Sequence, residues 1–437
     1  MKPVNVGIVG LGTVGSGTFN VLARNAEDIG RRVGRALQVT HIGARKENPN
    51  CDTSGVKVSS DIFEVVNDPE VDILVELIGG TTVAREVVMQ AIAQGKHVVT
   101  ANKALIAVHG NEVFSAAQAK GVTVAFEAAV AGGIPIIKAI REGLAANRID
   151  WVAGIINGTG NFILTEMKEK GRDFDDVLSE AQALGYAEAD PTFDVEGIDA
   201  AHKLTILASI AFGIPLQFDK AYTEGISKIT QADVQYAEEL GYCIKHLGVT
   251  RQTEGGVELR VHPTLVPKDR LIANVNGVMN AVMVMADAVG PTLYYGPGAG
   301  SEPTASAVVA DVVDVARILT ADPENCVPHL AFQADQLSDT PILPIEEVET
   351  AYYLRIRAMD TPGVMARIAT ILSVQNINIE SLIQKEVEVD EVGAVPIIMI
   401  TRKVKEKLMN EALAQITASD DIVGEVIRIR LEQLDAE

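Results

Sequence analysis

This sequence of 437 residues contains little that would support disulfide bonds or membrane-spanning segments. Its cysteines, Cys51, Cys243 and Cys326, are odd in number and widely spaced, which argues against a disulfide framework and favours free thiols in a reducing compartment. The most apolar segment, "LTILASIAFGIPL", has only about thirteen residues, too few to cross a bilayer. The first residues, "MKPVNVGIVG", lack a signal-peptide layout, so we expect a cytoplasmic protein with no membrane partner.

Positive charge is also scarce, with 37 Lys and Arg against 59 Asp and Glu and a net charge of −22. Such a surface repels nucleic acid and anionic membranes, although a small anion can still bind at a local basic spot. Aromatic residues make up 4% of the chain while 47% is hydrophobic, a composition typical of a soluble α/β enzyme. At this length we expect about two to four domains.

The first 130 residues alternate short apolar runs with helical patterns. Strands are expected at residues 4–9, 37–44, 71–77, 96–101 and 122–130, with helical stretches such as "TVAREVVMQAIAQGK" between them. This alternation predicts βαβ units in a twisted parallel sheet with helices on both faces. We therefore assign residues 1–130 to a Rossmann-like nucleotide-binding domain.

Two further regions follow. From residue 131 to 303 the chain has longer helices and glycine-rich loops, and the acidic, Pro-containing "SDTPILPIEE" at 338–347 reads as a linker. Residues 348–437 run strand, helix, strand, strand, helix, strand, with the first helix opened by Thr361 and Pro362. This βαββαβ order predicts a small α+β domain of the ferredoxin-like type.

A glycine pattern lies between the first strand and the first helix. Gly10, Gly12 and Gly15 form G-x-G-x-x-G, with Thr13 and Val14 inside it. The first glycine permits a tight turn, the second lets a pyrophosphate approach the backbone, and the third lets helix and strand pack closely. The helix N-terminus offers N–H groups to the anion. In this context the pattern favours a dinucleotide site over a mere turn.

The second strand is followed by Arg45 and Lys46, where an acidic residue would select NAD. A guanidinium there suits the 2′-phosphate of NADP. We expect NADP as the cofactor, with NAD also accepted. Loop cations that bind nothing remain the alternative.

The most informative stretch is "LGYAEADPTFDVEGIDAAHK" and the very apolar helix that follows it. Asp199 and Lys203 are four residues apart and therefore share one helix face. Burying either charge alone is costly, so the pair is expected to line a polar cleft. Lys103, in "TANKAL", follows a parallel strand at the edge where ligands of such sheets collect. His202 lies on another face and is expected to have a hydrogen-bonded structural role.

Metal ligation is not indicated by Cys243 and His246. The two are one helical turn apart if the segment is a helix, but two ligands do not make a zinc site. We interpret both as ordinary core or surface residues.

Several segments together resemble homoserine dehydrogenases of the long bacterial type. They span residues 4 to 325, and the segment 184–208 is the most diagnostic; the segments are "GIVGLGTVG", "TANKAL", "FEAAVAGGIPII", "INGTGNFILTEM", "LGYAEADPTFDVEGIDAAHKLTILA" and "YGPGAGSEPTASAVVADV". The segment "RAMDTPGVMARIATIL" resembles the start of an ACT domain, an amino-acid-sensing module. The resemblance implies reversible NAD(P)H-dependent reduction of L-aspartate 4-semialdehyde to L-homoserine, on the route to threonine, methionine and isoleucine.

The resemblance also implies roles for individual residues. Lys203 would donate and accept the proton, with Asp199 beside it and Lys103 between substrate and nicotinamide. The substrate would be bound by Glu188, Gly185 and Asp194, and the cofactor would be approached by Thr100 and Gly300. Residues 131–303 would form the substrate and dimerisation domain, and residues 304–325 would complete the nucleotide domain.

A cation site is likewise implied by the resemblance. Its ligands would be Glu127, Val130, Gly132 and Ile134, mainly through backbone carbonyls, and the ion would be sodium. One carboxylate with carbonyl oxygens on a Gly-Gly turn suits a hard cation.

The ACT resemblance suggests regulation by threonine. Gly363 would present backbone N–H groups and Asn376 a side-chain contact, and pairing of ACT units suggests a homodimer or homotetramer. A domain kept only for oligomerisation is the alternative. Two other functions stay open: a dehydrogenase with another substrate, such as one resembling phosphoglycerate dehydrogenase, and a non-catalytic amino-acid sensor. The first would need an Arg/Glu/His set that the sequence does not offer, and the second would not need Lys103, Asp199 and Lys203.

Overall fold

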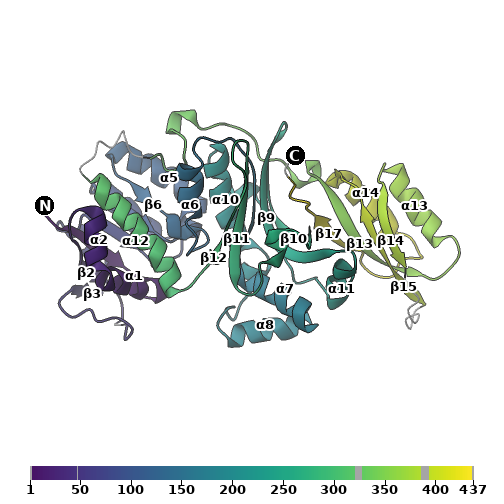
Figure 1. The fold of residues 1–437 in the computed structure, drawn as a ribbon, viewed down its shortest axis with the longest axis horizontal. Coiled ribbons are helices and arrows are strands. Elements are labelled where there is room, and N and C mark those ends of the chain that lie inside the picture. The colour runs from purple at the N-terminus through teal and green to yellow at the C-terminus, as the bar shows by residue number, and fades with distance from the viewer. Residues whose placement is uncertain (1, 47, 320–326, 385–392, 436–437) are drawn as a thin grey trace.

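The computed structural model describes residues 2–46, 48–319, 327–384 and 393–435. Two sheets organise this part of the chain (Figure 1). The nucleotide-binding part lies at one end, the second part in the middle and the C-terminal part at the other end. No helix within the described ranges combines the length and the apolar character that a bilayer crossing requires.

The first sheet has six strands in the order β3-β2-β1-β4-β5-β6, and every pair is parallel. The expected nucleotide-binding fold is therefore confirmed. The order reverses at β1 and β4, so ligands are expected at the carboxyl ends of these two strands. The elements are β1 (Val4–Val9), α1 (Thr13–Arg24), α2 (Ala26–Val33), β2 (Leu37–Gly43), β3 (Lys57–Ser59), α3 (Ile62–Asn67), β4 (Ile73–Glu76), α4 (Val83–Ala93), β5 (His97–Thr100), α5 (Lys103–Lys120) and β6 (Val124–Ala125).

The strand expected at residues 122–130 is much shorter in the structure. Only Val124 and Ala125 pair with β5, and a 3-10 helix follows at Glu127–Ala129. The backbone N–H of Glu127 donates to Asp311 at 2.7 Å instead of extending the ladder. Ala131 then has a positive φ of 52°, which turns the chain away.

Helix α12 (Ser301–Ile318) brings the chain back to the nucleotide-binding part, where it lies beside α1 (Figure 1). The Ser301 hydroxyl donates to the carbonyl of Thr13 at 2.8 Å. Arg24 and Glu302 form an ion pair at 2.6 Å. These contacts join the start of α12 to α1 at Thr13, its first residue, and at Arg24, its last.

The second part is built on antiparallel strands in the order β12-β11-β7-β9-β10. Cys243 and His246 lie on β9, so the helical spacing considered for them is wrong; the run is rich in β-branched and apolar residues and pairs with β10 throughout. The elements are α6 (Ile136–Lys138), a π-helix (Ala139–Gly143), β7 (Ile149–Ile155), α7 (Gly158–Lys170), α8 (Phe174–Ala183), α9 (Thr192–Val195), α10 (Ile198–Phe212), a 3-10 helix (Phe218–Lys220), β8 (Tyr222–Thr223), α11 (Gln231–Glu239), β9 (Tyr242–Thr253), β10 (Gly256–Pro267), a 3-10 helix (Leu271–Asn274), β11 (Met279–Ala286) and β12 (Gly290–Pro297).

The C-terminal part has the sheet order β17-β13-β15-β14, which confirms the ferredoxin-like fold. Helix α13 begins at Val364, later than expected, because Gly363 caps it with a φ of +94° and leaves Thr361 and Pro362 in the preceding turn. The elements are β13 (Glu349–Met359), α13 (Val364–Val374), β14 (Ile379–Gln384), β15 (Ala394–Thr401), β16 (Val404–Lys405), α14 (Glu406–Thr417) and β17 (Ile427–Leu431), with 3-10 helices at Ala334–Gln336 and Ile345–Glu347 before them.

The second and C-terminal parts share one continuous sheet, because β10 pairs in parallel with β17. Strand β13 is buried on both faces: Leu354 packs inside the C-terminal part, and Tyr353 packs with Ile163 and Leu265 of the second part. The segment 338–347 also follows β10, since Val257 exchanges backbone hydrogen bonds with Pro341 and Leu343. The C-terminal part is therefore docked on the second part.

Candidate active site

The glycine loop after β1 has the shape that a dinucleotide needs. Gly10 has a φ of +98°, and a Cβ there would lie 2.7 Å from the carbonyl oxygen of Leu77. A Cβ on Gly15 would collide with the carbonyl of Gly10. Nothing lies within 4 Å of a Cβ on Gly12, so the backbone faces open space at this position.

The N-terminus of α1 adds favourable electrostatics. Gly12 is its N-cap, no side chain caps the helix, and the first turn, which includes Thr13 and Val14, contains no acidic residue. Unpaired N–H groups with a partial positive charge fit a pyrophosphate. Arg45 and Lys46 are exposed just beyond β2.

The carboxyl ends of β4 and β5 fix the start of α5. The Thr100 hydroxyl donates to Glu76 at 2.6 Å. Asn102 donates to the carbonyl of Gly80 at 2.7 Å, and its side-chain oxygen accepts the N–H of Leu105 to cap α5. Lys103, the first residue of α5, is thereby held at the ligand-binding edge of the sheet.

Three charged side chains meet between the nucleotide-binding and second parts. The Nζ of Lys203 lies 2.6 Å from Asp199, which confirms that the two share a helix face. The Nζ of Lys103 lies 2.7 Å from the other oxygen of Asp199. Lys203 is nearly buried with a side-chain exposure of 11%, whereas 35% of Lys103 is exposed. We call these three residues the charged cluster.

Burial and the neighbouring charges both shift the pKa values of Asp199 and Lys203 in the charged cluster. Burial disfavours the charge on Asp199, but the ammonium groups of Lys203 and Lys103 hold its pKa well below the usual range. Burial lowers the pKa of Lys203, and the charge of Lys103 adds to this while Asp199 opposes it. A lysine with a lowered pKa gives up its proton more readily than an ordinary lysine, which suits a group that must both give and take a proton.

Asn157 completes the cluster and was not predicted from the sequence. Its side-chain oxygen accepts the N–H of Gly160 at 2.8 Å, which directs its NH₂ group to Asp194 at 2.8 Å and Asp199 at 2.9 Å. Lys203 also donates to the carbonyl of Ile156 at 2.7 Å. The sequence offered an Asn-Gly pair after a strand, which is typical of a turn or helix cap, inside the resemblance segment "INGTGNFILTEM"; neither assigned Asn157 a partner.

The residues predicted to bind the substrate do not all lie at the charged cluster. Asp194 reaches the cluster through Asn157; burial raises its pKa, although the hydrogen bond from Asn157 opposes the shift. Glu188 and Gly185 lie on the exposed turn between α8 and α9. Among the described residues, no hydrogen bond or ion pair joins the carboxylate of Glu188 to the charged cluster.

His202 packs in a structural position, as expected, but without the expected hydrogen bond at Nδ1. Its Nδ1 is buried and has no hydrogen-bond partner in the described ranges. Instead the ring stacks on Phe218, with centroids 4.1 Å apart, and lies 5.5 Å from Phe193. Burial lowers its pKa to about 4, so the ring is neutral at neutral pH. Because Phe218 lies far from His202 in the sequence, the local pattern could not reveal this stacking.

Glu127 is buried and caps the next helical segment. Its two carboxylate oxygens accept the N–H groups of Ile137 and Lys138, each at 2.9 Å. Burial and the charge of Asp311 raise the pKa of Glu127 to about 7. The chain turns tightly through Val130, Gly132, with a φ of +28°, and Ile134. Clusters of three or more His, Cys, Asp or Glu that could hold a metal are absent from the described ranges.

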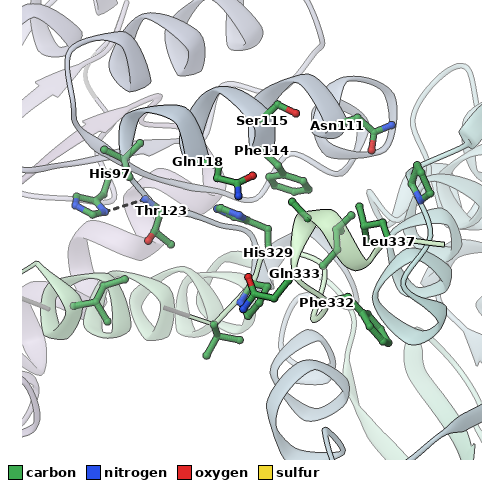
Figure 2. Close-up of a pocket in the computed structure, with 18 of the residues that line it drawn as sticks. His97, Asn111, Phe114, Ser115, Gln118, Thr123, His329, Phe332, Gln333 and Leu337 are labelled. Atoms are coloured by element: carbon green, nitrogen blue, oxygen red, sulfur yellow. Dashed lines mark hydrogen bonds between the residues drawn. The ribbon is translucent and has the colours of Figure 1, made fainter. Parts of the chain in front are cut away.

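A cavity of about 740 Å³ lies elsewhere, between the second half of α5 and residues 327–337 (Figure 2). His97 accepts the N–H of Thr123 at 3.1 Å, and His329 accepts that of Val124 at the same distance. Phe114 stacks on His329 with centroids 4.9 Å apart. None of the predicted catalytic, substrate or cofactor residues lines this cavity, so we do not equate it with the active site.

Three of the remaining predicted residues stand at turns or helix caps. Gly300 is the N-cap of α12 with a φ of +122°, and Gly363 caps α13. Asn376 follows α13 with a positive φ of 58°. Of the cysteines, Cys51 and Cys243 are free thiols, and Cys326 lies outside the described residues.

Family models match three consecutive regions of the chain. Residues 10–127 match the NAD-binding domain of homoserine dehydrogenase, residues 135–313 match homoserine dehydrogenase itself, and residues 352–419 match the ACT domain. The homoserine dehydrogenase of Pseudomonas aeruginosa is 72% identical, with 100% of each chain covered. That of Neisseria gonorrhoeae is 56% identical over 99% of this chain and 100% of its own.

Solved structures agree with these matches. A homoserine dehydrogenase from Thiobacillus denitrificans has a TM-score of 0.95 and 65% identity, covering 100% of this chain and 99% of its own. A hyperthermophilic archaeal homoserine dehydrogenase in complex with NADPH has a TM-score of 0.61 and 28% identity, covering 72% of this chain and 98% of its own. These matches exclude the phosphoglycerate dehydrogenase-like and sensor-only alternatives. The chain belongs to the homoserine dehydrogenase family, oxidoreductases that act on a CH–OH group.

Proposed function

We propose that Lys203 transfers the proton in the interconversion of L-homoserine and L-aspartate 4-semialdehyde. The observation that carries this proposal is the charged cluster, in which a nearly buried ammonium is paired with Asp199. An ammonium has three N–H bonds. Asp199 and the carbonyl of Ile156 accept two of those of Lys203, which leaves one for the substrate oxygen.

The chemistry of the reduction suits this arrangement. The bound nicotinamide cofactor supplies the hydride, and negative charge then develops on the aldehyde oxygen. Lys203 gives a proton to that oxygen, while Lys103 places a second positive charge nearby. Asp199 holds both ammonium groups in position. In the oxidative direction Lys203 must start neutral in order to accept the proton of the alcohol.

The substrate's amino acid end would be bound on the acidic side of the cluster. Asp194 is half-buried and lies next to Asn157 and Asp199, so its carboxylate can accept the substrate's ammonium. We also assign Glu188 and Gly185, on the exposed turn before α9, to binding the amino acid end of the substrate. Glu188 would have to approach as the substrate binds.

The cofactor proposed is NADP, with NAD also accepted. The open glycine loop fits either pyrophosphate, whereas Arg45 and Lys46 offer cationic partners for a 2′-phosphate. The similar archaeal enzyme was solved with NADPH, which supports the choice. We assign Gly300 to the cofactor's surroundings because it caps α12, whose Ser301 bonds to the carbonyl of Thr13 in the glycine loop. We assign Thr100 there because it ends β5 at the carboxyl edge of the same sheet and donates to Glu76 at the end of β4.

A sodium ion is proposed at Glu127, with carbonyls of Val130, Gly132 and Ile134. Each oxygen of Glu127 accepts one backbone N–H and keeps a second lone pair for an ion. Such a site would stabilise the turn that leads into the second part.

We further propose feedback inhibition by threonine through the ACT part, with contacts at Gly363 and Asn376. The exposed edge strand β14 carries Leu382 with 42% exposure, and Tyr295 on the edge strand β12 is 58% exposed. Both edges suit pairing with other copies, so we propose a homodimer or homotetramer. The free thiols of Cys51 and Cys243 suit the cytoplasm.

Lys203→Met, with Lys120→Met as the control, tests the central assignment. Lys120 is an exposed lysine at the end of α5. We expect Lys203→Met to lower kcat by about 10²–10⁴-fold while cofactor affinity, measured by NADPH fluorescence, stays unchanged. A Lys203→Met enzyme as active as Lys120→Met would refute the assignment.

A further inference from the structure

The ACT part is connected to the second part by a fully buried guanidinium. Arg430, on β17, donates from Nε to Glu406 at 2.8 Å. It also donates to Glu224 at 2.6 Å and to the hydroxyl of Tyr222 at 3.1 Å, both in the second part. The guanidinium lies over the Tyr222 ring, 4.9 Å from its centroid. Arg430 therefore holds Glu224 through a charged hydrogen bond, and it holds Tyr222 through both a hydrogen bond and a cation–π contact.

Tyr222 and Glu224 belong to a segment that contacts the start of the catalytic helix. We call Tyr222–Ser227 the bridging segment. The N–H of Ile226 donates to the carbonyl of Val195 at 2.9 Å, and the Ser227 hydroxyl donates to Glu196 at 2.8 Å. Gly225 packs so closely against the Glu196 carboxylate that no Cβ fits between them.

Val195, Glu196 and Gly197 form the turn from which α10 begins. Gly197 is the N-cap of α10 with a φ of +84°, and its carbonyl accepts the first helical hydrogen bond from Ala201 at 2.9 Å. His246 donates to the carbonyl of Glu224 at 3.0 Å and packs beside Gly197. Asp199 and Lys203 lie within the first two turns of α10, so the position of this turn sets the position of both.

We propose that Arg430 is a positioning residue for the reaction, because it holds the bridging segment, which in turn holds the start of α10 and thereby the charged cluster. This inference rests on the proposed role of Lys203. It makes the docked ACT part a structural requirement for full catalytic rate. It also provides a continuous path of contacts between the ACT part and the active site.

The chemistry of Arg430 fits this role. Its planar guanidinium makes several hydrogen bonds in one fixed geometry, which a lysine cannot reproduce. Although burial disfavours the charge of Glu224, Arg430 holds the pKa of that carboxyl below its usual value. Removing the guanidinium would take the arginine from two partly or fully buried carboxylates; Glu224 would keep only the hydroxyl of Tyr222, and Glu406 would keep Arg428 and the hydroxyl of Tyr352. The bridging segment would then lose its fixed position.

The first test compares Arg430→Lys with Glu432→Gln. Glu432 lies two residues further along, where it pairs with Arg260 of the second part at 2.6 Å without contacting the bridging segment. Both variants weaken the same interface, but only Arg430 bonds to side chains of the bridging segment. Arg260, the partner of Glu432, meets that segment through the backbone pairing of β10 with Tyr222 and Thr223. We expect Arg430→Lys to lower kcat by at least about tenfold with cofactor KM unchanged, since small misplacements of reacting groups are costly.

Because loss of a buried arginine can prevent folding, a second test acts on the bridging segment alone. Gly225→Ala introduces a methyl group that must displace Glu196 or the bridging segment. Gly143→Ala is its control, since a Cβ on Gly143 meets nothing within 4 Å. We expect Gly225→Ala, which changes no residue of the ACT part, to lower kcat about tenfold and to leave cofactor KM unchanged.

The outcomes separate this inference from the proposed function. It is supported if Gly225→Ala loses kcat relative to Gly143→Ala and a folded Arg430→Lys loses kcat relative to Glu432→Gln. It is overturned if Gly225→Ala retains the kcat of its control, or if Arg430→Lys and Glu432→Gln lower melting temperature and kcat equally. An active Lys203→Met enzyme would instead contradict the proposed function and would not bear on whether the start of α10 is held from the ACT part.

Discussion

Replacing Asp199 with asparagine removes the negative charge that holds both active-site lysines while keeping the shape of the side chain. Asp199 is nearly buried and lies 2.6 Å from Lys203 and 2.7 Å from Lys103. Its charge raises the pKa of Lys203 against the lowering effects of burial and Lys103. Without it, the pKa of Lys203 falls further.

The sign of the effect follows from which form of Lys203 reacts. Homoserine oxidation needs neutral Lys203, so its rate rises with pH and levels off above the pKa of Lys203. An opposite charge at this range shifts a pKa by about 1–3 units, or about 1.4–4 kcal/mol. We therefore expect the midpoint of the oxidative profile to move about 1–3 pH units lower in Asp199→Asn. The maximal rate also falls, because Lys203 loses its anchor.

The assay follows NADPH absorbance with homoserine as substrate, from neutral to strongly alkaline pH. The amino group of homoserine titrates identically with both enzymes, so the difference between the two profiles reports on the enzyme. Reduction of the semialdehyde should show the opposite dependence, with the rate falling as pH passes the same midpoint. An unchanged midpoint, or one displaced upward in Asp199→Asn, would refute the reasoning.

Three further predictions concern the cofactor and cation sites. Gly12→Ala should fold normally but raise cofactor KM, because its Cβ enters the open space beside the glycine loop. Gly15→Ala should lower the melting temperature, because its Cβ meets the carbonyl of Gly10. Equal effects of the two substitutions on melting temperature would contradict this prediction. Arg45→Ala with Lys46→Ala should weaken NADP binding about tenfold, about 1.4 kcal/mol, and leave NAD binding unchanged in a fluorescence titration; equal losses for both cofactors would count against a 2′-phosphate site. Sodium chloride should raise the melting temperature more than choline chloride does. This difference should be larger above pH 7 than below it, because the pKa of Glu127 is about 7 and its carboxylate must be charged to bind the ion. Glu127→Gln should abolish the difference between the two salts.

Features encoded by local spacing could be predicted from the sequence. The parallel sheet, the glycine loop and the βαββαβ order of the C-terminal part follow from periodicity and turn residues. The Asp199–Lys203 pair follows from helical spacing. The strand at residues 122–130 was overestimated because its apolar run resembles a strand, while the contact of Glu127 with Asp311 that ends it spans 184 residues.

Contacts between distant segments could not be predicted in this way. Asn157 reaches Asp194 and Asp199 across 37 and 42 residues, and nothing near it in the sequence indicates these partners. The same is true of Arg430, which reaches Glu224 across 206 residues. His202 was expected to find a hydrogen-bond partner, yet packing against aromatic rings determines its environment.

The most direct measurement is a crystal structure of the complex with homoserine and oxidised nicotinamide cofactor. The proposed mechanism predicts that the Nζ of Lys203 lies about 3 Å from the alcohol oxygen, within hydrogen-bond distance, while it still contacts Asp199. A structure in which Lys203 is paired with Asp199 but the alcohol oxygen bonds to another proton donor would contradict it.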